Sequence, residues 1–242
     1  MTAVVMTAAI LMAAAPATAA GARQKRVLLV SEARGFVHSS IPDAVAFFRA
    51  LGRRSPRFDV AHLDGGAAQL TRARLRRADG VVFANTSGEL PLPDRGALVR
   101  FVRSGGALVG THSASDTLHS WPGWRRLLGA RFRRHGTPAG GRLVVEDRRH
   151  PVTRGLPASF RLLEEFYEFT SSPRPRVHVL LRLDPASVDD ELRPDVPLAW
   201  TRRFGRGRVF YDALGHFPET WSDPRHSRLA SRGLRWALRL GP

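Results

Sequence analysis

The sequence predicts a single α/β domain built on a mostly parallel sheet that helices cover on both faces. In the first half of the chain, short apolar runs alternate with amphipathic helical segments, which is the pattern of βαβ units. Short apolar runs in such an order imply a parallel sheet covered on both faces. The length of 242 residues suits one domain of ordinary size.

The first half of the chain holds four expected strands and two expected helices. The apolar runs that predict the strands cover residues 26–31, 58–63, 80–85 and 106–111. Ser40 and Pro42 open an amphipathic helix that continues through Leu51. A second helix is expected between the last two of these strands, because apolar residues recur there at helical spacing until two glycines end the pattern.

The second half is less regular but predicts the same class of fold. Five further strands are expected, over residues 141–147, 162–169, 177–183, 197–203 and 207–214. An amphipathic helix over residues 223–240 closes the chain. Neither an internal repeat nor a long linker interrupts the sequence, so one domain over residues 26–240 is the simplest organisation.

Residues 1–20 have the composition of a secretory signal peptide. They are apolar and rich in alanine, end in an Ala-Thr-Ala triplet, and precede the charged stretch "RQKR". Cleavage is expected after Ala19 or Ala20, which predicts a secreted or extracytoplasmic protein. The apolar stretch is short for a membrane span, and no cysteine is present to carry a lipid anchor.

The charge balance is strongly basic, but it does not indicate a nucleic-acid reader. The formal net charge is +17, and because Lys25 is the only lysine, 37 of the 38 basic residues are arginine. These arginines are scattered through every segment and are not interleaved with stacking aromatic residues. We expect no specific nucleic-acid partner; weak attraction to anionic lipids or polymers stays open. The absence of cysteine excludes disulfides, thiolate metal sites and a cysteine nucleophile.

Three histidines follow strands at the edge where an open α/β sheet binds its ligands. His112 stands at a strand-to-helix turn in "GGALVGTHSASD", where a nucleophile elbow presents a reactive side chain. His38 follows the first expected strand and His216 follows the last. A single histidine at a strand end is more often a structural hydrogen-bonding group, but three at comparable depth indicate a shared site. Two other histidines, His119 and His226, are expected to be exposed.

Glu164 and Glu165 in "LLEEFYEF" are the carboxylates most able to complete that site. Alternation along a strand places one of them on each face. A carboxylate in the pocket can orient a histidine or act as a general acid or base, whereas one on the surface would pair with an arginine; the spacing leaves both open. Several histidines and a glutamate also permit a divalent metal, but no local spacing of the HExxH kind exists. We therefore expect no cofactor, with a divalent metal as the minor alternative.

Several motifs in a fixed order give the chain a family resemblance over residues 26–240. They are "FVHSS", "GGALVGTHSASD", "WPGWRRLLGARFRRH", "VVEDRRHPVTRGLP", "EEFYEF", "PLAWTRRFGRGRVFYDALGH" and Trp221. On these motifs the chain resembles the trehalose-utilisation (ThuA-like) family, a branch of the class I glutamine amidotransferase-like fold. Glu164 stands where the family often has aspartate.

The resemblance implies a doubly wound, flavodoxin-like sheet with a pocket at the ends of its strands. By position it assigns catalytic roles to His38, His112, Glu165 and His216. It places His135, Trp200 and Trp221 near the pocket as substrate-binding residues. True amidotransferases carry cysteine at the elbow; with a histidine there, glutamine hydrolysis by that route cannot occur.

The function implied by the resemblance is that of a sugar-processing enzyme acting on a disaccharide, glycoside or keto-sugar. His112 and His216 would transfer protons, and Glu165 would orient them or serve as a base. The substrate class comes from the resemblance alone, and a fold does not define a reaction. The alternatives are a non-catalytic domain that binds carbohydrate or another small ligand, and an accessory module.

Overall fold

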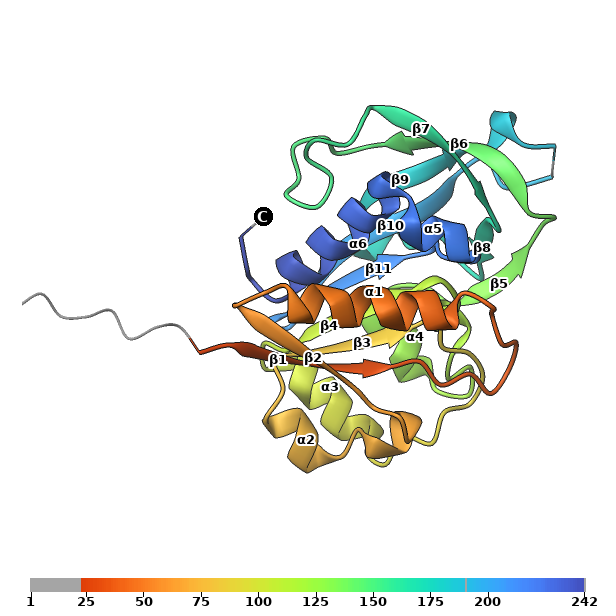
Figure 1. The fold of residues 1–242 in the computed structure, drawn as a ribbon. Helices are drawn as coiled ribbons and strands as arrows, with labels where there is room; N and C mark the ends of the chain where they lie inside the picture. Colours follow the sequence, from red (N-terminus) through yellow and green to blue (C-terminus); the bar gives the residue numbers. More distant parts are fainter. Residues whose placement is uncertain (1–22, 190, 242) are drawn as a thin grey trace, which may run out of the picture.

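A nine-stranded sheet runs through the molecule in the computed structural model, which describes residues 23–189 and 191–241 (Figure 1). The signal peptide predicted over residues 1–20 lies outside the described residues. In spatial order the strands are β2 (Phe58–His62), β1 (Lys25–Val30), β3 (Gly80–Ala84), β4 (Ala107–Thr111), β11 (Gly207–Asp212), β10 (Val196–Phe204), β9 (His178–Asp184), β6 (Ala139–Val145) and β7 (Ser159–Glu164).

The sheet has a parallel part and an antiparallel part that meet at β11. The five strands from β2 to β11 pair in parallel. From β11 to β7 the pairing is antiparallel throughout. The α/β class is confirmed, and the parallel arrangement predicted from the first half holds for that half and for β11.

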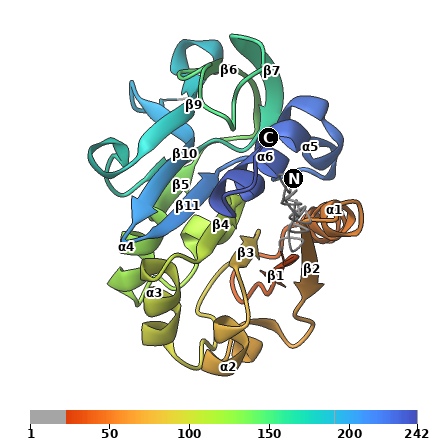
Figure 2. The ribbon, with the colours of Figure 1, turned by 90° about the vertical axis from the view of Figure 1, so that its left-hand side faces the viewer.

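Helices lie on both faces of the sheet (Figure 2). One face is covered by α1 (Ile41–Arg53), α5 (Pro218–Ser222) and α6 (Pro224–Ala237). The other is covered by α3 (Arg95–Arg103) and α4 (Pro122–Leu128), and α2 (Arg72–Arg76) packs beside α3. Within residues 23–189 and 191–241, no helix is long and apolar enough to cross a membrane.

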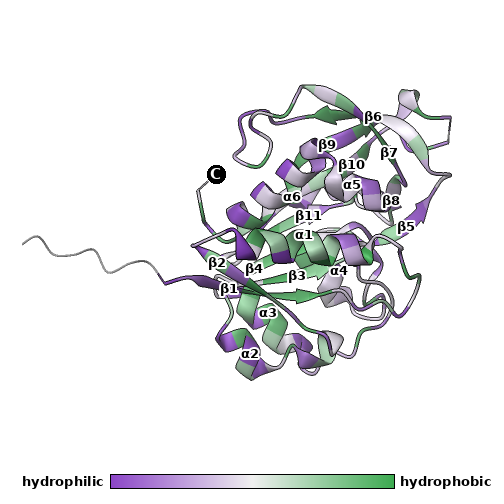
Figure 3. Ribbon diagram, in the orientation of Figure 1, coloured by the Kyte–Doolittle hydropathy of each residue, from purple (hydrophilic) through white to green (hydrophobic). Residues whose placement is uncertain are grey.

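The core forms where the central strands are apolar on both sides (Figure 3). All five residues of β3 and all five of β4 are buried. α1 turns Ala44 and Phe48 towards the sheet and leaves its polar side in solvent. Each large apolar side chain buried in this way contributes about 1.5–3 kcal/mol of transfer free energy.

The helices begin where the sequence offers a cap. Asp94 accepts from the backbone N–H of Ala97 at the start of α3, and Asp223 caps α6 in the same manner. Ser40 stands at the cap position of α1, as predicted, but its side chain makes no capping bond. It donates instead to the carbonyl of Gly215, 2.7 Å away, and so connects α1 to the turn after β11.

The strand predicted over residues 162–169 is in fact two strands. β7 ends at Glu164, and β8 covers Tyr167–Phe169. The chain breaks between them because β7 pairs with β6 in the large sheet, whereas β8 pairs with β5 (Phe132–His135) in a separate two-stranded sheet.

His226 is another correction, because it was expected to be exposed and is completely buried. It lies on the face of α6 that also carries Leu229 and Ala230, and this face packs against the sheet. Its Nε2 lies 2.9 Å from a carboxylate oxygen of Asp212, which is also buried. His119 keeps 43% of its side chain exposed, as predicted.

Candidate active site

Four side chains from separate segments meet beyond the carboxyl ends of the parallel strands. His38 lies between β1 and α1, His112 follows β4, and His216 follows β11. Glu165 lies in the link between β7 and β8. Each offers one ligand atom, and these four atoms all lie within 4.8 Å of one another. We call these four residues the His/Glu cluster.

His112 is at the centre of the cluster. Its backbone adopts a φ of 45°, which turns the chain sharply at the end of β4. Its Nδ1 lies 2.9 Å from the carbonyl oxygen of Ala213; since a carbonyl only accepts, Nδ1 carries the proton. The unprotonated Nε2 therefore faces His38 Nε2 at 3.0 Å, the hydroxyl of Tyr167 at 3.0 Å and His216 Nδ1 at 3.3 Å.

Glu165 joins the buried part of the cluster to its open edge. One carboxylate oxygen lies 3.2 Å from His216 Nδ1 and 3.6 Å from His112 Nε2. The other lies 3.2 Å from Nδ1 of His135, the last residue of β5. The side chains of His216 and His135 are 17% and 42% exposed, whereas that of His112 has no exposed surface.

Glu164 holds the turn that carries His216. Its carboxylate accepts hydrogen bonds from the backbone N–H groups of Gly215 and His216 and from the hydroxyl of Thr220. Gly215 has a φ of 112°, and a side chain there would come within 2.9 Å of Trp221. A left-handed turn with no room for a Cβ requires glycine.

Burial and mutual contact set the proton affinities of the cluster. Burial, with the neighbouring His216 as the second cause, lowers the pKa of His38 to about 4. Burial also lowers the pKa of His112 well below its usual value. Burial acts to raise the pKa of Glu165 and to lower the pKa of His216. Their contact outweighs burial, so the pKa of Glu165 is lowered and that of His216 is raised. Burial raises the pKa of Glu164. The contact between Glu165 and His216 is thus the ion pair of the site.

The structure brings five of the seven predicted site residues together: His38, His112, His135, Glu165 and His216. The two tryptophans lie behind the site. Trp200 is completely buried and donates to the carbonyl of Leu128. Trp221 is 5% exposed and packs on Phe47 and Phe48 of α1. In this structure both rings support the core behind the site, without a free face for a substrate.

Tyr167 belongs to the site although sequence reasoning did not select it. Its ring stacks on His112 with centroids 4.4 Å apart, and its hydroxyl contacts His112 Nε2. It lies opposite His135 in the pairing of β5 and β8. The available indication was its spacing, because a residue two positions after Glu165 in an extended segment points to the same side.

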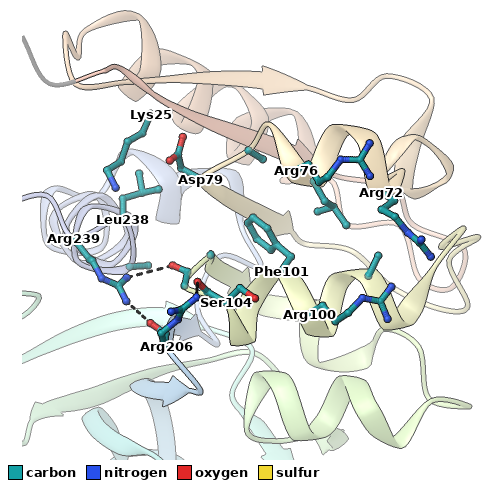
Figure 4. Close-up of a pocket in the computed structure, with 16 residues that line it drawn as sticks. Lys25, Arg72, Arg76, Asp79, Arg100, Phe101, Ser104, Arg206, Leu238 and Arg239 are labelled. Atoms are coloured by element: carbon teal, nitrogen blue, oxygen red, sulfur yellow. Dashed lines mark hydrogen bonds between the residues drawn. The ribbon is translucent and has the colours of Figure 1, made fainter.

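A separate cavity of about 690 Å³ opens at the opposite end of the strands, near Lys25 and Gly106 (Figure 4). Five arginines line it, and four of them have partners within the protein. Arg72 and Arg100 contact Asp94, and Arg206 and Arg239 donate to backbone carbonyls. This cavity shares no lining residue with the cluster.

The fold and the site define the class of the protein. A parallel sheet with a reactive elbow after a central strand is the arrangement of the class I glutamine amidotransferase-like proteins, and here the elbow carries His112 in place of cysteine. Residues 26–237 match the ThuA family, described as trehalose utilisation. The chain belongs to this family.

Solved structures support the same fold. A ThuA-like protein from Bacteroides uniformis is 26% identical with a TM-score of 0.77, over 93% of this chain and 95% of that one. A ThuA-like protein from Parabacteroides merdae is 19% identical with a TM-score of 0.73, over 89% and 90%. A β-galactosidase from Bacillus circulans shares the fold at 16% identity and a TM-score of 0.55, over 89% of this chain but 30% of that enzyme. No curated protein matches this chain.

Proposed function

We propose that this ThuA-family protein is an enzyme that processes a disaccharide, a glycoside or a keto-sugar at the His/Glu cluster. The family description, trehalose utilisation, supports the substrate class. The observation that carries the proposal is the convergence of three histidines and a glutamate from four separate segments, with one edge open to solvent. Such a group of titratable side chains is costly to assemble and is typical of functional sites.

In this proposal the exposed histidines of the site exchange protons and the buried ones position them. His216 and His135 lie at the open edge and both contact Glu165, so they can exchange protons with a bound sugar. His38 and His112 are buried and position the others. The elbow carries an imidazole instead of a thiol, so the thiolate route of the amidotransferases is not available at this site.

The test is turnover of a panel of sugars by the full chain. Trehalose, other disaccharides, aryl glycosides and their keto derivatives are incubated with the protein, and the products are followed by NMR. We expect turnover of at least one class, and we expect His216→Ala to abolish it. His178→Ala is the matched control, because His178 pairs with Asp147 outside the cluster.

Two outcomes would contradict the proposal. Sugar binding without turnover by the wild-type protein would identify a carbohydrate-binding domain. Neither binding nor turnover of any sugar would remove the sugar assignment altogether.

A further inference from the structure

We propose that the His/Glu cluster holds one divalent transition-metal ion, with His38, His112, His216 and Glu165 as its ligands. The role of this ion in sugar processing rests on the proposed function. Binding of the ion follows from geometry alone and is measured without a sugar.

The distances between the ligand atoms match those of a coordination shell. The Nε2 atoms of His38 and His112 are 3.0 Å apart, and His112 Nε2 lies 3.3 Å from His216 Nδ1. A Glu165 oxygen lies 3.2 Å from His216 Nδ1 and 3.6 Å from His112 Nε2. Ligands about 2.0–2.1 Å from a tetrahedral ion are about 3.3 Å from one another. All four atoms lie within 4.8 Å of one another, so one ion can lie between them.

The lone pairs also point to a cation. Nδ1 of His112 donates to the carbonyl of Ala213, which leaves Nε2 with a lone pair and no proton. The hydroxyl of Ser113 lies 3.3 Å from Nδ1 of His38 and can fix its ring in the same way. That single lone pair of His112 faces four polar atoms within 3.6 Å, more than its hydrogen-bonding capacity satisfies. A partner on the far nitrogen is also the usual support of a metal-binding histidine.

The donor set restricts the identity of the ion. Three imidazole nitrogens and one carboxylate oxygen suit zinc, cobalt, nickel or iron, whereas magnesium and calcium prefer shells of oxygen. The sequence showed no short ligand motif because the four ligands come from four segments. A site of this kind cannot be found from local spacing in the sequence. The arrangement favours a bound divalent metal, which was the minor alternative in the sequence analysis.

A bound ion changes which residue handles protons. It occupies Nδ1 of His216, while His135 stays free beside the other oxygen of Glu165. The Tyr167 hydroxyl also lies next to the ligand atoms. The hydroxyl and ketone oxygens of a sugar are ligands that such an ion accepts, so the ion would bind the substrate while His135 exchanges the proton.

The test uses the untagged full chain, stripped with a chelator and dialysed. Zinc binding is measured by calorimetry, cobalt coordination by visible absorption, and stoichiometry by elemental analysis. We expect one equivalent of zinc and the absorption bands of a low-symmetry cobalt site. His216→Ala and Glu165→Gln should each weaken zinc binding at least tenfold, and circular dichroism should show that both variants are folded.

His178→Ala is again the control, because His178 and Asp147 form the surface pair that could capture an adventitious ion. Zinc binding lost in His178→Ala but retained in His216→Ala would overturn the inference, as would the absence of stoichiometric binding. Sugar turnover by a stripped protein that takes up no stoichiometric zinc would overturn the metal assignment and leave the proposed function standing. One bound equivalent of zinc without turnover of any sugar would support the metal assignment and contradict the proposed function.

Discussion

His112 is held in an unfavourable backbone conformation by contacts on both of its sides. A left-handed φ costs a residue with a side chain about 1–2 kcal/mol, and His112 has a φ of 45°. Its carbonyl accepts a hydrogen bond of 2.7 Å from Tyr211, and its Nδ1 donates to Ala213. These bonds offset the cost and fix the ring so that Nε2 faces the cluster.

This arrangement predicts that His112 matters for stability as well as for function. We expect His112→Ala to lower the free energy of unfolding by about 1–3 kcal/mol, because it leaves buried polar groups without a partner. His112→Asn should lose less, since asparagine tolerates positive φ better than alanine. Urea denaturation of the three proteins measures the difference. A smaller loss for alanine than for asparagine would contradict this account of the turn.

Glu165 and His216 should behave as one unit, because they share the ion pair of the site. We expect each of His216→Ala and Glu165→Gln to reduce turnover of the substrate at least 100-fold, the scale of a lost acid–base group. The double variant should lose less than the product of the two single losses, since groups that act together are not additive. Steady-state kinetics of the four proteins test this; fully multiplicative losses would mean that the two residues act independently.

The turn after β11 is held by the carboxylate of Glu164, the last residue of β7. Both oxygens of Glu164 accept hydrogen bonds, and Glu164→Gln would replace one of them with a donor that faces backbone N–H groups. We expect a loss of about 2–3 kcal/mol in unfolding free energy and lower activity, because His216 is displaced. Thermal and urea denaturation measure it. Glu219→Gln, on the exposed side of α5, is the control and should change little.

The buried pair of His226 and Asp212 joins α6 to β11 and should make stability depend on pH. Burial acts against the charged imidazole, but Asp212, and more weakly Glu164, raise the pKa of His226 above 6.5. The folded state then binds a proton more tightly than the unfolded state. The resulting stabilisation is complete below pH 6.5 and is lost as the pH rises through the folded pKa.

The predicted outcome is a decrease of unfolding free energy above pH 6.5 that is smaller in His226→Gln than in the wild-type protein. The contribution is about 1.4 kcal/mol for each tenfold difference in proton affinity between the two states. Urea denaturation at a series of pH values measures it. Parallel pH profiles for the two proteins would show that the pair is not the cause.

Sequence patterns predicted the elements that local chemistry determines. The fully apolar runs became buried strands, and the rule that ligands lie at the strand ends placed His38, His112 and His216 together. The break after Glu164 was missed because "LLEEFYEF" contains no glycine or proline; partners distant in sequence impose it. His226 was expected to be exposed, although its spacing to Leu229 and Ala230 follows the buried face of α6.

Arginines give the molecule its strongly basic charge. Many of those in the described structure pair with acids or with backbone carbonyls, as around the cavity near Lys25 (Figure 4). With a net charge of +17, the protein should still attract polyanions weakly through counterion release.

We therefore expect binding to nucleic acid that is indifferent to sequence and disappears near physiological salt, about 0.15 M. Fluorescence anisotropy with unrelated single-stranded and duplex oligonucleotides, at low and at physiological salt, measures it. Tight binding to one defined sequence at the higher salt would instead identify a specific partner.

β11 is the last strand of the described chain to be synthesised, yet it lies in the middle of the sheet, between β4 and β10. The antiparallel strands cannot join the parallel ones through the main sheet until residues up to Asp212 have left the ribosome. Until then both parts of the nascent chain expose unpaired edges, which are prone to pair with other chains. His216 follows β11 closely, so the His/Glu cluster forms only after the same insertion. A chain that ends before β11 should therefore be inactive and prone to aggregate.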